Sequence, residues 1–343
     1  MYNQHEVSDA APPAFKNVSF CRRLAILGEM ISKRQRKVQK GHYALLVNRT
    51  ARGYNEKAVS RLIAAIHGHK LAYTVYEPDS AMNVMRQAEV AVGLRQATQT
   101  LPRPYERGGK VTGLVACGGD GTFNLVARAA LKAGLPVAPY PLGRVNNVAN
   151  SFYGTTDPSQ VIKNILSSGA RASDAATVSG LPFFVSIGLG FAPQMLAEMG
   201  DRPLPRLAMG WARLGGEAAA KVESARIVVK VDSFRFEIQP TILNINVLPY
   251  TVGLALTPVS LPDDGQLEVV FDVTPQVEKF ASFTRLLRKK QYLFGDEFRL
   301  YRGRVIAVEG VAGRTLYLDG ELVKLPADVL EVRVEEKKLQ VLR

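Results

Sequence analysis

The chain has 343 residues, enough for about two domains, and 47% of them are hydrophobic, which excludes a globally disordered protein. No apolar run approaches the ~20 residues that a membrane span needs, and the first ten residues lack the apolar core of a signal peptide. The net charge of +13 suits an anionic lipid, an anionic substrate or nucleic acid, but no zinc-finger spacing or aromatic RNA-binding signature supports nucleic acid as a partner.

Residues 1–40 are predicted to form a basic extension outside the main fold. Residues 16–40 carry eight Lys and Arg residues against a single acid, and apolar residues lie between the basic ends. This pattern is typical of an amphipathic helix on an anionic membrane surface, and the alternative is a solvated basic tail. Cys21 and Cys117 lie in different contexts and predict no disulfide framework, so we expect a cytoplasmic protein, peripheral to the inner face of the membrane.

Residues 41–172 alternate between predicted strands and predicted helices. Apolar runs predict strands at 43–47, 71–76, 111–117 and 137–142. Apolar residues at helical spacing predict helices at 59–66, 80–100 and 122–133. The alternation predicts an N-terminal α/β domain, with a parallel sheet and helices on its faces.

The pattern changes after residue 172, where short alternating segments predict strands. Ile227–Val231 and Phe234–Ile238 flank Asp232-Ser233 and predict a hairpin. Further strands are predicted at 241–248, 267–273, 304–309, 314–318 and 329–334, with an α-rich insertion at about 192–221. We therefore predict an antiparallel β-sandwich domain over 173–325, followed by a C-terminal segment over 326–343.

The segment Gly118–Thr122, with the sequence GGDGT, lies at a predicted strand-to-helix turn. Glycines let backbone N–H groups approach a ligand closely, and successive N–H groups at a helix N-terminus favour an anion such as phosphate. Asp120 would repel a bare phosphate, so a cation or water between the two is expected. The alternative is a tight turn with a capping aspartate, because short glycine motifs often occur by chance.

Three motifs in this order resemble the diacylglycerol kinase catalytic-domain family, which includes bacterial lipid kinases and the sphingosine and ceramide kinases. They are GGDGT at 118–122, PLGRVNNVAN at 141–150 and LDGE at 318–321. The resemblance covers roughly residues 43–325. It implies an α/β nucleotide-binding domain, a β-sandwich domain that binds the lipid, and an active site in the cleft between them. It also allows the segment 326–343 to return to the first domain.

The resemblance implies that the chain binds ATP. The predicted nucleotide-binding residues are Asn48, Gly118, Gly119, Gly121, Thr122, Gly143, Arg144, Asn146 and Asn147. Arg144 stands where the family usually has threonine, and it either contacts a phosphate or signals an altered activity. Asn147 stands where many members have aspartate. Arg52, in the loop after the first strand, is either a further phosphate ligand or a solvated loop residue.

The resemblance also implies the catalytic acids. It assigns Asp319 as the group that accepts the proton of a lipid hydroxyl, with Glu321 assisting and Asp120 as the third acid. Residues i and i+2 of an extended strand share a face, so Asp319 and Glu321 can both face the cleft. From the sequence alone, an Asp-Gly hairpin turn is the simpler interpretation of Asp319.

Two cation sites are implied by the resemblance. Asp174 resembles a family acid that joins Asp120 in holding magnesium through water, which suits an ion that keeps several waters. Asp264, with the carbonyl groups of Leu261 and Gln266, resembles a family loop that binds a structural Mg²⁺ or Ca²⁺.

We therefore expect an ATP- and Mg²⁺-dependent lipid kinase that phosphorylates the hydroxyl of a diacylglycerol-like or sphingoid-type lipid. A kinase of a soluble nucleotide such as NAD is an alternative, because NAD kinases share the fold. A non-catalytic lipid- or nucleotide-binding module is another, suggested by Arg144 and Asn147, although the three retained acids argue against it. The expected partners are a lipid alcohol and an anionic membrane surface, and a homodimer stays open.

Overall fold

The computed structural model describes residues 41–97, 109–167, 169–200, 202–288 and 298–343. The predicted basic extension over 1–40, Cys21 and most of the loop before the third strand lie outside these residues. All of the elements below belong to one compact unit, Lys40–Arg343.

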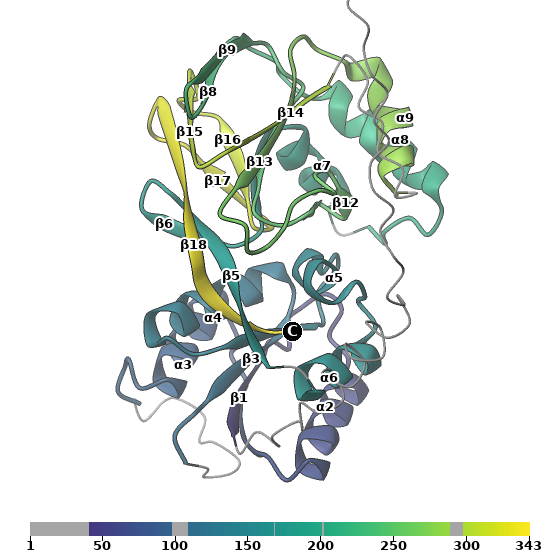
Figure 1. Cartoon of the computed structure of the whole chain (residues 1–343). Helices are drawn as coiled ribbons and strands as arrows, with labels where there is room; N and C mark the ends of the chain where they lie inside the picture. The colour runs from purple at the N-terminus through teal and green to yellow at the C-terminus, as the bar shows by residue number, and fades with distance from the viewer. Residues whose placement is uncertain (1–40, 98–108, 168, 201, 289–297) are drawn as a thin grey trace, which may run out of the picture. The chain divides into compact units, whose positions relative to one another are not determined.

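The first lobe is built on four parallel strands in the order β2-β1-β3-β4. They are β1 His42–Val47, β2 Ala72–Tyr76, β3 Gly113–Gly118 and β4 Val137–Pro141. The helices are α2 Glu56–Gly68, α3 Ala81–Ala91, α4 Asp120–Ala133, α5 Asn147–Tyr153 and α6 Pro158–Ser167. This alternation confirms the predicted α/β domain (Figure 1).

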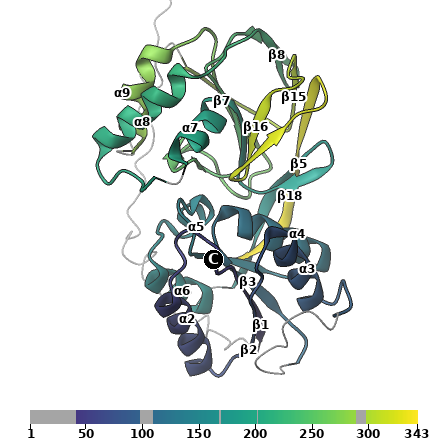
Figure 2. The ribbon, with the colours of Figure 1, turned by 180° about the vertical axis from the view of Figure 1, so that it is seen from behind.

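Alternate residues of β1 point into two different cores, as the period of a strand requires. Tyr43, Leu45 and Val47 belong to the core under α2 and α6, which lie side by side (Figure 2). Ala44 and Leu46 belong to the core on the opposite face, with residues of α3 and α4. Both faces of the parallel sheet are therefore buried, which explains its nearly continuous apolar strands.

The second lobe contains an antiparallel sheet in the order β14-β13-β10-β7-β16-β17. Its strands are β7 Ser186–Gly190, β10 Ile242–Asn246, β13 Leu267–Asp272, β14 Phe298–Gly303, β16 Thr315–Leu318 and β17 Glu321–Lys324. The helices α7 Phe191–Met199, α8 Ala208–Ala220 and α9 Phe280–Arg288 pack on it around a shared core, and the short helix η1 Val277–Lys279 directly precedes α9. The antiparallel second domain with an α-rich insertion is confirmed.

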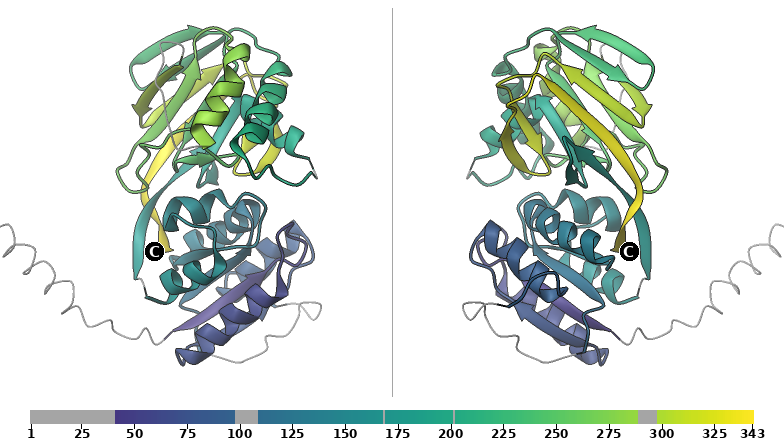
Figure 3. Two further views of the ribbon diagram at one scale, coloured as in Figure 1. Left: turned by 90° about the vertical axis from the view of Figure 1, so that its right-hand side faces the viewer. Right: turned by 90° about the vertical axis from the view of Figure 1, so that its left-hand side faces the viewer.

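A single sheet continues from the first lobe into the second through β18 Val329–Leu342. Val341 of β18 pairs in parallel with Val137 of β4, and residues 332–342 of β18 pair with β5 Ala170–Val178. The sheet is completed by β6 Leu181–Phe183, β8 Ile227–Val231, β9 Phe234–Ile238 and β15 Val305–Glu309, and a small ribbon by β11 Tyr250–Thr251 and β12 Leu254–Ala255. Figure 3 shows β5 and β18 running together between the lobes.

Several element boundaries differ from the sequence-based expectation, among them the following three. The helix predicted over 80–100 ends at Ala91, because Gly93 at φ 77° turns the chain out of the helix. Helix α4 begins at Asp120 instead of 122. The strand predicted over 329–334 continues to Leu342, with a register shift between Glu335 and Leu339. Within the ranges that the structure describes, no helix is both long and apolar enough to cross a membrane.

Candidate active site

The GGDGT loop and the turn between β16 and β17 adjoin. A methyl group on Gly121 would lie 3.4 Å from Oε1 of Glu321, and one on Gly320 would lie 3.8 Å from Cβ of Asp120. The loop connects the carboxyl end of β3 to the N-terminus of α4. Open α/β sheets bind ligands at such an edge, and the N-terminus of a 14-residue helix favours an anion.

Three glycines from three segments pack backbone to backbone beside the loop. A Cβ on Gly143 would lie 2.2 Å from Cα of Gly119, and one on Gly53 would lie 2.4 Å from the carbonyl oxygen of Gly143. Asn146 has φ 59°, accepts from the Gly143 N–H at 2.8 Å and donates to the Gly143 carbonyl at 3.0 Å. Residue 143 must therefore be glycine. The two hydrogen bonds between the Asn146 side chain and the Gly143 backbone close the turn.

Asn48 and Thr122 hold the loop to the end of β1. Asn48 Nδ2 donates to Thr122 Oγ1 at 2.9 Å, and the Asn48 N–H donates to the Cys117 carbonyl at 2.9 Å. Thr122 lies inside the first turn of α4 and is 6% exposed, and a Cβ on Gly118 would lie 2.4 Å from its Oγ1. Both predicted nucleotide-binding side chains therefore fix the shape of the loop.

Asp120 joins the GGDGT loop to the second motif. Its Oδ2 accepts from the N–H and Nδ2 of Asn147, both at 3.0 Å, and its Oδ1 accepts from the Val148 N–H at 2.9 Å. Burial raises the pKa of Asp120 to about 6, although these hydrogen bonds oppose the rise. Three of the four lone pairs of the carboxylate are occupied, so one on Oδ1 remains available to a ligand.

Asp319 is buried at 2% exposure and its carboxylate is saturated with hydrogen bonds. Oδ1 accepts from the N–H groups of Val185 and Ser186, both at 2.9 Å. Oδ2 accepts from the Phe184 N–H at 2.7 Å and from Asn124 Nδ2 at 2.6 Å. Four donors occupy all four lone pairs, so Asp319 cannot accept another proton without losing a bond. Burial also raises its pKa.

Glu321 and Tyr317 flank Asp319 on the same strand pair. The Glu321 carboxylate is exposed and accepts no hydrogen bond from another described residue. Tyr317 is 1% exposed, and burial together with the charges of Asp120 and Asp319 raises the pKa of its phenol well above the ordinary value. Tyr317 was not among the predicted site residues. It lies two residues before Asp319 on a predicted strand, a spacing at which two side chains share one face of the strand.

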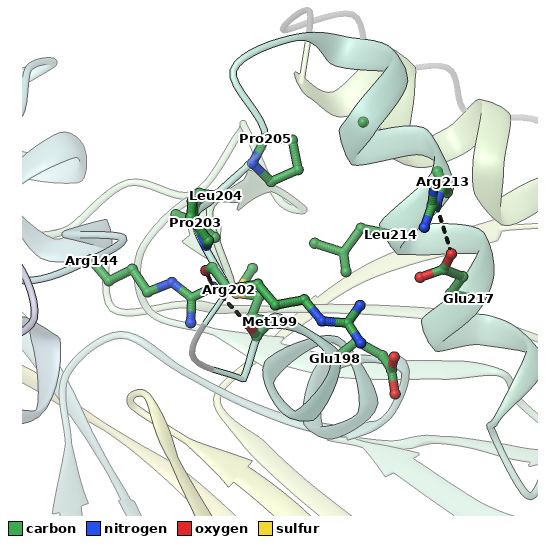
Figure 4. Close-up of a pocket in the computed structure, with 11 residues that line it drawn as sticks. Arg144, Glu198, Met199, Arg202, Pro203, Leu204, Pro205, Arg213, Leu214 and Glu217 are labelled. Carbon is green, nitrogen blue, oxygen red and sulfur yellow. Dashed lines mark hydrogen bonds and ion pairs between the residues drawn. The ribbon is translucent and has the colours of Figure 1, made fainter.

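Arg144 and Arg52, from two loops of the first lobe, both bind the C-terminal end of α7. Arg144 donates to the carbonyl groups of Met199 at 2.8 Å, Arg202 at 2.6 Å and Gly200. Arg52 Nη1 donates to the Gly200 carbonyl at 2.5 Å. Cations stabilise the unpaired carbonyls at a helix C-terminus. The two arginines thus connect the lobes, and Figure 4 shows Arg144 beside Met199.

A cavity of about 380 Å³ lies between these groups. Its polar lining residues are Arg52, Asp120, Arg144 and Asn147, together with Gly121 and Gly320. Its apolar lining residues are Val145, Leu196, Ala197, Met199 and Val252, and Tyr317 and Gly200 also line it. Residues from both lobes therefore line a site that combines cations and glycine backbone with apolar side chains.

Asp174 and Asp120 accept hydrogen bonds from different segments. Its Oδ2 accepts from the Gly265 N–H at 2.7 Å, and its Oδ1 accepts from the Lys337 N–H at 2.7 Å. Lys337 has φ 50° and lies in the irregular part of β18. Asp174 thus ties the 261–266 loop to β18, while Asp120 binds the start of α5.

At the predicted cation site in the 261–266 loop, an arginine side chain contacts Asp264. Asp264 Oδ1 accepts from the Gln266 N–H at 3.1 Å, and Oδ2 forms an ion pair with Arg302. Leu261 is 54% exposed. No cluster of three or more His, Cys, Asp or Glu side chains in the described ranges is arranged to hold a metal ion. Asp120 still fits magnesium, since this ion is usually held by one or two carboxylates, waters and substrate phosphates.

Comparisons with known proteins bear on the family of the chain. The family model of the diacylglycerol kinase catalytic domain matches residues 42–178. A relative from Pseudomonas fluorescens with the name "Probable lipid kinase YegS-like" is 30% identical over 237 residues, which are 67% of this chain and 77% of that protein. An uncharacterized protein from Synechocystis sp. is 25% identical over 289 residues, which are 79% of this chain and 62% of that protein.

The chain spans less than two thirds of the length of the Synechocystis relative. A crystal structure of a diacylglycerol kinase from Bacillus anthracis shares the fold, with a TM-score of 0.66 at 12% identity over 88% of this chain and 96% of that chain. The three ordered motifs, the two-lobe fold and the Pseudomonas relative lead to one assignment. The chain belongs to the diacylglycerol kinase catalytic-domain family.

Proposed function

We propose that the protein transfers the γ-phosphoryl group of ATP to the hydroxyl of a neutral lipid of the diacylglycerol or sphingoid type. The observation that carries this proposal is the cavity that both lobes enclose, with the GGDGT loop and the Asp-Gly-Glu turn on its walls. Phosphoryl transfer needs positioned phosphates, a counter-charge and an oriented acceptor hydroxyl. The cavity offers a group for each need.

Backbone N–H groups of the GGDGT loop and the N-terminus of α4 would hold the phosphates. Arg52 and Arg144 border the same cavity and would supply positive charge close to them. Asp120 would hold Mg²⁺, which when bound would supply counter-charge to the phosphates. The available lone pair on Asp120 Oδ1 is the group of this chain that would orient it, directly or through a water.

We assign the acceptance of the lipid proton to Glu321 instead of Asp319. The Asp319 carboxylate already accepts four hydrogen bonds, whereas Glu321 accepts none from the described residues and lies beside Gly121. As the acceptor oxygen bonds to the γ-phosphorus and ADP leaves, its proton would pass to the Glu321 carboxylate. Asp319 would act as a positioning residue that holds the turn carrying Glu321.

The apolar residues that line the cavity support a lipid acceptor over a soluble nucleotide. Val145, Leu196 and Val252 offer no hydrogen-bonding side chain to the ribose or nicotinamide of NAD. The test incubates the full chain with labelled ATP, Mg²⁺ and either mixed micelles of diacylglycerol, monoacylglycerol, sphingoid base or ceramide, or NAD. Labelled lipid that disappears in Asp120→Asn supports the proposal. Labelled NAD without labelled lipid would replace it with the nucleotide alternative.

We further propose that the segment between α7 and α8, together with the first two turns of α8, contacts an anionic membrane surface. Leu207 and Met209 are 75% and 67% exposed, and the exposed cations Arg202, Arg206 and Arg213 lie close to them in the sequence. The segment borders a pocket of about 200 Å³ beside Arg144 (Figure 4). Apolar side chains flanked by cations suit an anionic bilayer, because each cation near such a surface contributes about 1 kcal/mol.

A further inference from the structure

The loop over residues 261–266 is the place where the family resemblance implies a structural divalent cation. In this chain the two oxygens of Asp264 are already engaged. The Gln266 N–H donates to Oδ1 at 3.1 Å, and the guanidinium of Arg302 pairs with Oδ2. A cation that used Asp264 would first have to displace a positively charged group.

Arg302 contacts a second acid from the neighbouring strand. Its Nε donates to Glu268 Oε1 at 2.9 Å, and the side chain of Glu268 is fully buried. The two residues lie directly opposite each other in the antiparallel pair of β13 and β14. One guanidinium therefore bridges a loop acid and a buried strand acid, as a divalent cation with oxygen ligands would do.

The remaining acids around the loop have partners of their own. Asp263 pairs with Arg343 at 3.2 Å, Glu336 pairs with Arg304, and Asp174 accepts two backbone N–H groups at 2.7 Å. The donors that contact these acids are guanidinium and backbone groups. Among the described residues, no cluster of carboxylates around the loop is arranged to hold an ion.

We propose that Arg302 takes the place of the structural cation in this chain, so that the 261–266 loop needs no divalent ion. The Arg302 guanidinium is covalently attached to β14, and its Nη2 and Nε supply the two contacts to Asp264 and Glu268. The loop then stays closed in the presence of a chelator, and the divalent requirement of the protein is confined to the nucleotide site.

Because of where the loop lies, the replacement of the cation by Arg302 has a structural consequence. Asp174 belongs to β5 and Lys337 to β18, the two strands that run between the lobes. Gly265 of the loop donates to Asp174, so the loop is attached where these strands meet. Arg302 therefore helps to fix the connection between the lobes without a metal ion.

Removal of Arg302 should create the cation site that the wild-type chain lacks. Arg302→Gln frees Asp264 Oδ2 and Glu268 Oε1, and Glu268 Oε2 is already buried without a hydrogen-bond partner in the described part of the chain. Carboxylate oxygens with backbone carbonyls are the ligands that Ca²⁺ prefers. The variant should therefore gain a dependence on Ca²⁺.

The experiment measures thermal unfolding of the full chain without nucleotide, in EDTA and during titration with Ca²⁺ or Mg²⁺. Asp120→Asn is used as the background throughout, so that a cation at Asp120 does not contribute. In EDTA, Arg302→Gln should lower Tm by about 2–8 °C. Ca²⁺ should restore most of this loss in Arg302→Gln and leave the Tm of the background unchanged. Arg235→Gln, an exposed arginine paired with exposed Glu237, is the matched control and should not respond to Ca²⁺.

Two results would overturn the proposal. One is a rise in Tm with Ca²⁺ in the background that Asp264→Asn abolishes, because the loop would then bind a cation beside Arg302. The other is a folded Arg302→Gln that stays indifferent to Ca²⁺. If Arg302→Gln fails to fold, Arg302→Lys takes its place, because it retains a positive charge. Arg302→Lys should fold and should not respond to Ca²⁺. A Ca²⁺ response in Arg302→Lys would also contradict the proposal that Arg302 replaces the cation.

Discussion

Asn124 on α4 donates a hydrogen bond of 2.6 Å from Nδ2 to Oδ2 of Asp319, which lies 195 residues later in the turn between β16 and β17. The bond joins the helix of the phosphate loop to the turn that carries Glu321, and both partners are buried. Because Asp319 also accepts three backbone N–H groups of residues 184–186, it fixes the two walls of the cavity relative to each other.

Asp319→Asn should destabilise the protein. The amide replaces one acceptor oxygen with an NH₂ group that faces buried N–H donors, and each buried donor left unpaired costs about 1–3 kcal/mol. We expect a clear fall in the free energy of unfolding, measured with urea. Activity should fall as well, because the turn that carries Glu321 would be misplaced. A variant with wild-type stability and greatly reduced kcat would return Asp319 to the role of proton acceptor.

Glu321→Gln should separate chemistry from stability. If Glu321 accepts the lipid proton, kcat should fall by about 10²–10⁴-fold, the usual contribution of a general base. Tm and the ATP dissociation constant should stay close to wild type, because the side chain is exposed and accepts no hydrogen bond from the described residues. Lys324→Gln, on the same short strand, is the control. Near wild-type kcat in Glu321→Gln would exclude Glu321 from the reaction.

The sequence predicted where the site lies better than what each side chain does there. Gly119 and Gly143 are required by the close approach of two backbone segments, and Gly118 by its close approach to Thr122, and such approaches leave a motif in the sequence. The roles of Asp319, Arg144 and Asp174 depend on which N–H or carbonyl groups face them from distant elements. No local pattern encodes those partners. The family resemblance therefore assigned Arg144 to a phosphate, Asp174 to magnesium and Asp319 to the proton of the lipid hydroxyl.

The fold shows the same division. Apolar runs identified the parallel strands, which are buried on both faces, and alternation identified the 227–238 hairpin, whose first strand buries every second residue. Neither pattern predicted that β18 would pass the predicted end at residue 334 and pair with β5 and β4. The irregular stretch between Glu335 and Leu339 breaks the alternation there, and Asp174 compensates for it from another strand.

Gly121→Ala should weaken ATP binding with little loss of stability. The added methyl group meets only Glu321 Oε1, at 3.4 Å, but it lies where phosphates would approach the backbone. We expect roughly a tenfold rise in the ATP dissociation constant, equivalent to about 1.4 kcal/mol, by calorimetric titration. Gly143→Ala should instead unfold the loop, because its methyl group would lie 2.2 Å from Cα of Gly119. Gly68→Ala, which meets nothing within 4 Å, is the control. Unchanged ATP affinity in Gly121→Ala would remove the loop as the phosphate site.

Asp120 predicts a specific pH dependence of stability. Its pKa in the folded protein is about 6, above the ordinary value of 3.8, so folding favours the protonated form. The stabilisation from this group is therefore fully present below pH 3.8 and is lost as the pH rises through about 6. The difference in unfolding free energy between wild type and Asp120→Asn, measured without Mg²⁺ from pH 4.5 to 7.5, should move against wild type as the pH rises. A difference that is flat with pH would show that Asp120 ionises normally.

Membrane contact through the segment between α7 and α8 predicts that its apolar side chains matter as well as its charge. Leu207→Ser with Met209→Ser should reduce binding of the full chain to phosphatidylglycerol vesicles by roughly five- to thirtyfold, since withdrawing two exposed apolar side chains costs about 1–2 kcal/mol. Met82→Ser with Leu94→Ser removes side chains of similar exposure from another surface and is the control. Binding is measured by sedimentation with the vesicles. Neutralising Lys33, Arg34, Arg36 and Lys37 tests the basic extension in the same assay.

The two surfaces can be told apart by salt. Binding through the basic extension alone should vanish at high ionic strength, where exposed charges are screened, and should be insensitive to the Leu207 and Met209 substitutions. Binding through the α7–α8 segment should keep a salt-resistant part that only these two substitutions remove. If the double variant sediments with vesicles as well as the control does at every salt concentration, the α7–α8 segment does not contact the membrane.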